Sequence, residues 1–215
     1  MAIKWLIDAS YFVAAILFIL GLKGMSSPVS ARKGIVWAGV GMVLATVVTF
    51  LTPGMNNLAL MVIAIAVGGA LAWVSGKKVA MTDMPQMVAI YNGMGGGAAA
   101  AIAAVEFARG EMHGTVVTLL ATLGALIGAV SFSGSVVAWA KLQGVMNKAF
   151  RLPAQNAVNV VLALVTLGLG VAIVIAPAID PMLVGAFFVL ALVLGAVITL
   201  PIGGADMPVV ISLFN

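Results

Sequence analysis

The chain has 215 residues, of which 64% are hydrophobic and only 7% are charged. This composition excludes a water-soluble domain, because too few polar side chains remain to cover a soluble surface. The absence of cysteine and the single histidine exclude disulfides, thiolate metal sites and a metal site that this chain builds from histidines. The net charge of +4 is dispersed over short loops, which excludes a basic patch for nucleic acid.

Seven apolar segments reach or approach the length needed to cross a hydrocarbon core of about 30 Å. They are residues 5–22, 34–51, 58–74, 84–107, 116–140, 157–176 and 181–202, and an eighth begins at Met207. The predicted fold class is therefore all-α integral membrane, a polytopic helical bundle with seven full spans and the start of an eighth. Residues 1–215 are predicted to form a single transmembrane domain.

Basic residues concentrate in alternate loops. The first, third and fifth loops hold eight of the ten, namely Lys23, Arg32, Lys33, Lys77, Lys78, Lys141, Lys148 and Arg151. Basic loops of membrane proteins stay on the cytoplasmic side. The sequence therefore predicts an N-terminus outside and odd-numbered loops in the cytoplasm, which also places Asp206 on the cytoplasmic side.

A short sequence occurs twice. "DMPQMVAIYN" at 83–92 and "DMPVVISLFN" at 206–215 share their Asp, Met, Pro and Asn in register. Four spans separate the two starts, so both copies enter the membrane from the same side and form a parallel repeat. Each aspartate is predicted to cap its helix by accepting from first-turn amides, and the proline there lacks an N–H that would be unpaired anyway. Asp83 is thus a predicted helix cap, with Gln86 completing a capping-box pattern.

Each copy ends in an asparagine, nine positions after its aspartate. At 1.5 Å per residue this depth is about 13.5 Å, close to the middle of the bilayer. Asn92 and Asn215 are therefore predicted to be midplane amides. Two interpretations stay open: an interhelical hydrogen bond that only fixes packing, or a place on a polar pathway.

Asn92 shares one face of its predicted helix with several small residues, and Glu106 lies on the same face near the outer end. The small residues are Ala89, Gly95, Gly96, Ala99 and Ala103. The segment 116–140 has a similar stripe, which includes Ser135 at roughly 9 Å inside the cytoplasmic boundary. Small residues permit close helix packing and also leave room for water beside an amide. We therefore expect either tight packing alone or a wet path from Glu106 past Asn92 to Ser135, although a serine often bonds only its own helix.

The second copy follows two glycines. Gly203 and Gly204 precede Asp206 and allow the backbone to bend or to pack closely. The segment is interpreted either as an ordinary helix start or as a hinge or docking surface.

Three stretches in order, "KKVAMTDMPQMVAIYNG", "SFSGSVVAWAKLQG" and "GGADMPVVISLFN", resemble the membrane domain of the β subunit of proton-translocating nicotinamide nucleotide transhydrogenase. The resemblance runs the whole length of the chain. It implies an enzyme complex that couples proton translocation to hydride transfer between NAD(H) and NADP(H). It also implies functional roles for Asn92, Ser135 and Asn215 in the membrane and for Asp206 where the NADP(H) domain meets it.

The resemblance further implies what this chain binds. It implies no cofactor in this chain, because NAD(H) and NADP(H) are bound by domains outside it; no metal is expected either, on the composition given above. The implied partners are α-type subunits with transmembrane helices, an NADP(H)-binding domain, membrane lipid and a second protomer in a homodimer, in an inner (plasma) membrane. The chain is expected to be part of a longer protein, interrupted within its eighth helix.

One position departs from the family pattern. Many relatives have a titratable histidine where this chain has Asn92, and an amide cannot carry a proton. Either a partner subunit supplies the titratable group or the relay runs through water. Two other classes stay open: a self-contained multi-span solute or ion transporter or channel, and a passive membrane anchor.

Overall fold

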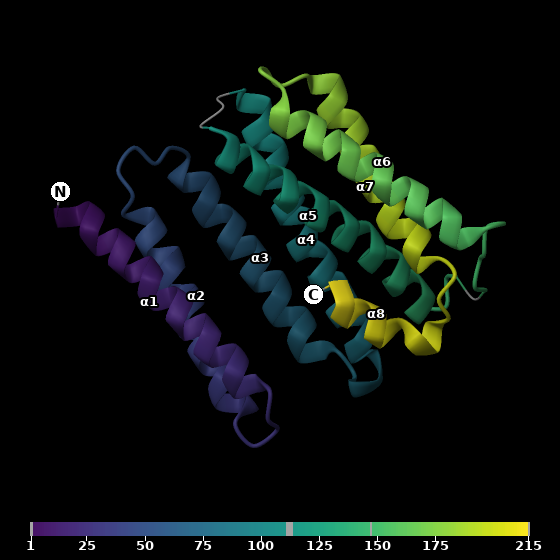
Figure 1. Ribbon diagram of the computed structural model, residues 1–215. Coiled ribbons are helices and arrows are strands. Elements are labelled where there is room, and N and C mark those ends of the chain that lie inside the picture. Colours follow the sequence, from purple (N-terminus) through teal and green to yellow (C-terminus); the bar gives the residue numbers. More distant parts are fainter. Residues whose placement is uncertain (1, 111–113, 147, 215) are drawn as a thin grey trace. The chain divides into compact units, whose positions relative to one another are not determined.

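The computed structural model describes residues 2–110, 114–146 and 148–214, and Figure 1 shows their helices. The long elements are α1 (Ala2–Met25), α2 (Ala31–Phe50), α3 (Leu58–Lys78), α4 (Met84–Arg109), α5 (Thr115–Leu142), α6 (Gln155–Ile175) and α7 (Pro181–Thr199). The shorter α8 (Met207–Phe214) follows, and one-turn 3-10 helices, η1 (Met81–Asp83) and η2 (Gly204–Asp206), precede α4 and α8.

Seven of the described helices are long and apolar enough to cross a membrane. The predicted class, an all-helical multi-pass membrane protein with the start of an eighth helix, is confirmed. The side of the membrane on which the N-terminus lies stays a prediction.

The end of α7 shows how one residue sets a helix boundary. The helix was expected to continue to residue 202, but it ends at Thr199. Pro201 has no N–H to donate to the carbonyl of Val197, which would otherwise receive the next helical bond. The amide of Gln155 donates to this carbonyl instead, at 3.0 Å.

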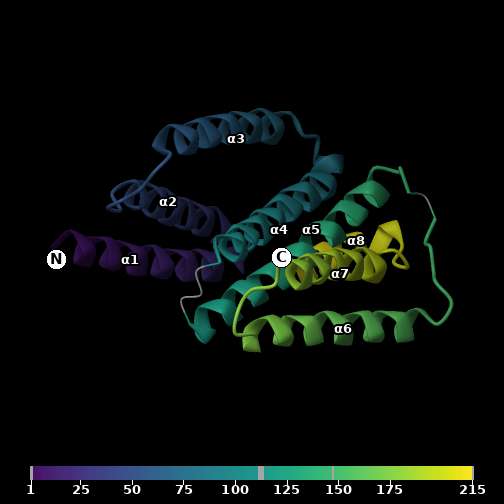
Figure 2. The same cartoon turned by 90° about the horizontal axis from the view of Figure 1, so that it is seen from above.

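The chain divides into two compact units, residues 1–77 and 78–215. In the first unit α1 and α2 lie side by side, as Figure 2 shows. Glycines form their contact: a Cβ on Gly21 would lie 2.9 Å from the carbonyl oxygen of Gly34. Only residues without a side chain permit so close an approach. Tyr11 and Thr49 share a hydrogen bond of 2.9 Å across the same pair, whereas α3 has no buried residue.

The second unit is arranged around α5, which contacts α4, α6, α7 and α8 (Figures 1 and 2). The small-residue stripes expected on α4 and α5 face each other. A Cβ on Gly96 would lie 2.8 Å from the carbonyl oxygen of Gly128, and one on Gly128 would lie 2.6 Å from that of Gly96. The two backbones are therefore in direct contact at this crossing.

Two apolar clusters lie in the second unit. One contains the buried residues Ala103, Phe107, Ala125, Ile173 and Phe187. The other contains Ala89, Ala138, Met207, Val210 and Ile211 and joins the first turns of α4 and α8 to the last turns of α5. Along α4, the residues from 90 to 102 connect the two clusters, and this stretch contains Asn92.

Candidate functional site

Asn92 is the centre of a hydrogen-bonded chain within the second unit. Its Nδ2 donates to the Ser135 hydroxyl at 2.9 Å and makes a longer contact, 3.4 Å, with the Ser131 hydroxyl. The two serines are one helical turn apart and therefore share a face of α5. Ser131 in turn donates to the backbone carbonyl of Phe214 at 2.9 Å. The chain thus links α4, α5 and α8.

Glycines next to Asn92 explain why its short side chain reaches α5. A Cβ on Gly93 would lie 3.2 Å from the Cβ of Ser135, and Gly96 touches the α5 backbone one turn further along. Ser135 is fully buried and Ser131 nearly so. A polar group at such depth in an apolar helix is costly unless it is paired. These bonds therefore hold the amide and the hydroxyls in place.

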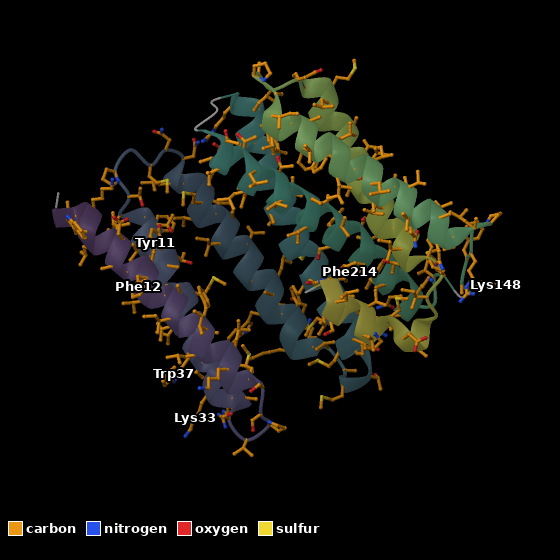
Figure 3. All side chains as sticks on the ribbon, in the orientation of Figure 1. Tyr11, Phe12, Lys33, Trp37, Lys148 and Phe214 are labelled. Carbon is orange, nitrogen blue, oxygen red and sulfur yellow. The ribbon has the colours of Figure 1, made fainter. Side chains whose placement is uncertain are left out.

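A cavity of about 580 Å³ opens beside Asn92 between α4 and α5. Its lining residues are Val88, Tyr91, Asn92, Gly95, Gly96, Ala99, Gly124, Ile127, Gly128, Ser131 and Phe214. Figure 3 shows Phe214 in the last described turn of α8. None of the described residues that line the cavity has a carboxylate or an imidazole. The cavity has polar groups and room for water.

The structure brings Asn92 and Ser135 together but not every residue predicted to accompany them. Glu106 is half-buried near the other end of α4 and does not line the cavity, which follows α4 only from Val88 to Ala99. Asn215 lies outside the described residues. Their places on a proton pathway stay predictions.

Ser131 was missed as a site residue. The signal for it was present, because Ser131 belongs to the same small-residue stripe and lies one turn from Ser135. Only the contact with Phe214 shows that it joins α8 to the site.

The hydrogen bond predicted for the Asp83 side chain is absent. Asp83 occupies the N-cap position of α4, but its carboxylate accepts no bond from the helix amides. The reason is the backbone: η1 runs directly into α4 and leaves Asp83 at φ −102°, ψ 4°, not in the extended conformation of a capping residue. Gln86 does not complete the capping box either, and its Nε2 donates to the Leu142 carbonyl at 3.3 Å.

The two glycines before Asp206 are not required by the backbone conformation. Gly203 has φ −71° and ψ 157°, and Ala80, its counterpart in the first copy, has φ −73° and ψ 153°. A Cβ on Gly203 would meet no atom within 4 Å. Neither strain nor a close contact explains this glycine, so what it adds is backbone freedom. Asp206 itself is exposed at the end of η2.

Comparison with known proteins connects this geometry to a family. A model of the family described as NAD(P) transhydrogenase beta subunit matches residues 7–215. Two relatives named NAD(P) transhydrogenase subunit beta, one from Rhodospirillum rubrum and one from its strain ATCC 11170, are each 41% identical over 218 residues. The match covers 96% of this chain and 46% of each relative, so the chain spans less than half the length of these relatives. The matched region includes both copies of the repeat and the serines of α5. This chain therefore belongs to the NAD(P) transhydrogenase beta subunit family.

Proposed function

We propose that this chain is the proton-conducting membrane part of a transhydrogenase that couples proton translocation to hydride transfer between NAD(H) and NADP(H). The observation that carries the proposal is the hydrogen-bonded chain from Asn92 through the serines of α5 to α8, beside a cavity with polar groups. Membership of the transhydrogenase beta subunit family supports it. Both nucleotides bind to domains outside this chain, and Glu106 and Asn215 extend the proton pathway.

The proton-carrying group comes from a partner in this proposal. Neither an amide nor a serine hydroxyl changes charge near neutral pH, so Asn92 and Ser135 orient water and do not store the proton. A transmembrane helix of an α-type subunit supplies a histidine or carboxylate that faces the cavity. The lining supports this step, because the described residues there provide room and hydrogen-bonding groups without a carboxylate or an imidazole.

Asp206, with Gly203 and Gly204, couples the pathway to the NADP(H)-binding domain. The carboxylate is exposed at the start of α8, where a domain outside the membrane can reach it. The opposite end of α8 holds Phe214, whose carbonyl accepts from Ser131. A displacement at Asp206 is therefore connected through one short helix to the polar site, and two positions of this helix would give the two states that coupling requires.

The membrane placement follows from charge. The bias of basic residues toward the odd-numbered loops supports a cytoplasmic location of those loops, in an inner (plasma) membrane. The assembled enzyme is a homodimer of protomers in which each protomer contains the α-type subunits.

Replacement of Asn92 tests the proposal. In the full-length enzyme, assembled with its partners in proteoliposomes, Asn92→Leu should lower proton-coupled transhydrogenation by about tenfold or more, about 1.4 kcal/mol in barrier height. Hydride exchange that cycles on bound NADP(H) without translocation should persist, since its reacting groups lie elsewhere. The matched control is Asn156→Leu, the same substitution at an exposed position in the first turn of α6.

Wild-type proton pumping by the Asn92→Leu enzyme would show that this amide only fixes packing, as the passive-anchor interpretation requires. A structure of the assembled membrane domain tests the partner step separately. A dry apolar surface opposite Asn92 and Ser135 would refute it.

A further inference from the structure

Lys141, in the last turn of α5, is a buried cation. Its side chain is only 7% exposed, and its ammonium donates to three backbone carbonyls: Thr199 at 3.2 Å, Leu200, and Ile202 at 2.5 Å. An ammonium has three N–H groups, so these carbonyls use all of them. The acceptors lie at the C-terminal end of α7, where the helix dipole is negative and a cation is favoured.

Other groups converge on the same end of α7. Gln155 donates to the Val197 carbonyl that Pro201 leaves without a helical donor, and the N–H of Phe150 donates to the Leu200 carbonyl at 3.2 Å. All of these donors lie between Lys141 and Gln155, in the end of α5, the loop after it and the first residue of α6. The last carbonyls of α7 are therefore fixed by a dedicated set of contacts.

The fixed end lies directly before residues 203–206, which connect α7 to α8 and are called the joint below. Ile202, which accepts from Lys141, is followed by Gly203 and Gly204, the residue type that restricts the backbone least. On the far side of the joint, Met207 is fully buried in the cluster with Ala138. The two glycines are thus bounded upstream by carbonyls that Lys141 holds and downstream by a packed helix.

We propose that Lys141 is a positioning residue for this joint. By holding the end of α7, it makes a displacement of Asp206 move α8 and the Ser131 contact. Without it, the segment from Leu200 to Gly203 would absorb the displacement. The coupling part of this inference rests on the proposed function, whereas the positioning itself does not. Counting charges by loop could not find this role, because the count treats Lys141 like the exposed Lys148.

Spin-label mobility in the assembled enzyme tests the inference. These 215 residues contain no cysteine, and any cysteines elsewhere in the assembled enzyme are first replaced. A cysteine at the exposed Ala205 then provides a label at the joint, and one at Met182, which is 83% exposed, reports on the opposite end of α7. Lys141→Met should increase label mobility at position 205 but not at 182. It should also lower proton-coupled transhydrogenation about tenfold relative to exchange that cycles on bound NADP(H).

Lys148→Met is the matched control, since it removes the same charge from an exposed side chain in the loop between α5 and α6 (Figure 3). It should change neither mobility nor coupling. Lys141→Arg, which keeps the charge and the donors, should restore most of both properties. If Lys141→Met does not assemble, Lys141→Gln keeps two N–H donors without the charge and should give a smaller shift in the same direction.

Unchanged mobility at position 205 would overturn the inference. An equal increase at 205 and 182 would overturn it too, because that result means general loosening of the helix. Failure of the proposed function would be visible separately, as a wild-type enzyme that moves no protons while the label at 205 still responds to Lys141→Met.

Discussion

The two copies of the repeat have the same sequence signature and the same backbone but different surroundings. In each, a one-turn 3-10 helix ends at aspartate and an α-helix begins at methionine. Met84 is 39% exposed, whereas Met207 is fully buried. The residues before Asp206 include two glycines and follow carbonyls held by Lys141. The repeated residues therefore determine how the helix begins, whereas the tertiary contacts differ between the copies and are the basis for proposing a joint only at the second.

The largest expected difference between the copies is in stability. Met207→Ala removes a fully buried side chain from the cluster that joins α4, α5 and α8, and should destabilise the membrane domain by about 2–5 kcal/mol. Met84→Ala, at a partly exposed position, should cost less than about 1 kcal/mol. Thermal unfolding of the two variants in detergent checks this pair, and equal shifts of the midpoint would show that α8 is not packed as described.

A smaller effect is expected within α5, where two serines differ in what they bind. Ser135→Ala removes the shorter of the two Asn92 bonds and should cost about 1 kcal/mol, together with a loss of proton-coupled turnover. Ser133 donates to the carbonyl of Ala129 in its own helix at 3.1 Å, so Ser133→Ala should leave turnover unchanged. Assays of proton-coupled turnover in proteoliposomes compare the two variants. Similar losses of turnover would contradict a specific role for Ser135.

The smallest effect on stability is expected at the glycines. Gly203→Ala gives the second copy the residue that Ala80 provides in the first, and the new Cβ meets no atom within 4 Å. The free energy of unfolding should therefore change by less than about 1 kcal/mol. Coupled turnover should still fall by a few fold, because the joint loses freedom. Ala80→Gly is the control and should leave turnover unchanged. A fully active Gly203→Ala enzyme would show that Gly203 does not act as a hinge.

Sequence reasoning located the helices well because span length and local start signals carry that information. The helices α3, α4, α7 and α8 begin at the expected residues, and the expected small-residue faces meet at Gly96 and Gly128. Side-chain partners were harder to predict, since periodicity identifies a face but not the neighbour opposite it. Gln86 matched a capping pattern yet contacts Leu142, and Lys141 was counted as a loop charge although it is buried.

Substitution of the two aspartates tests the difference between the copies most directly. Asn in place of Asp keeps the size and the polar atoms but removes the charge. In the assembled enzyme, with forward and reverse transhydrogenation and proton movement measured together, Asp206→Asn should lower coupled turnover about tenfold and leave exchange on bound NADP(H) in place. Asp83→Asn should stay within about twofold of wild type. Equal effects of the two substitutions would contradict the assignment of Asp206 as the joint between the proton pathway and the nucleotide domain.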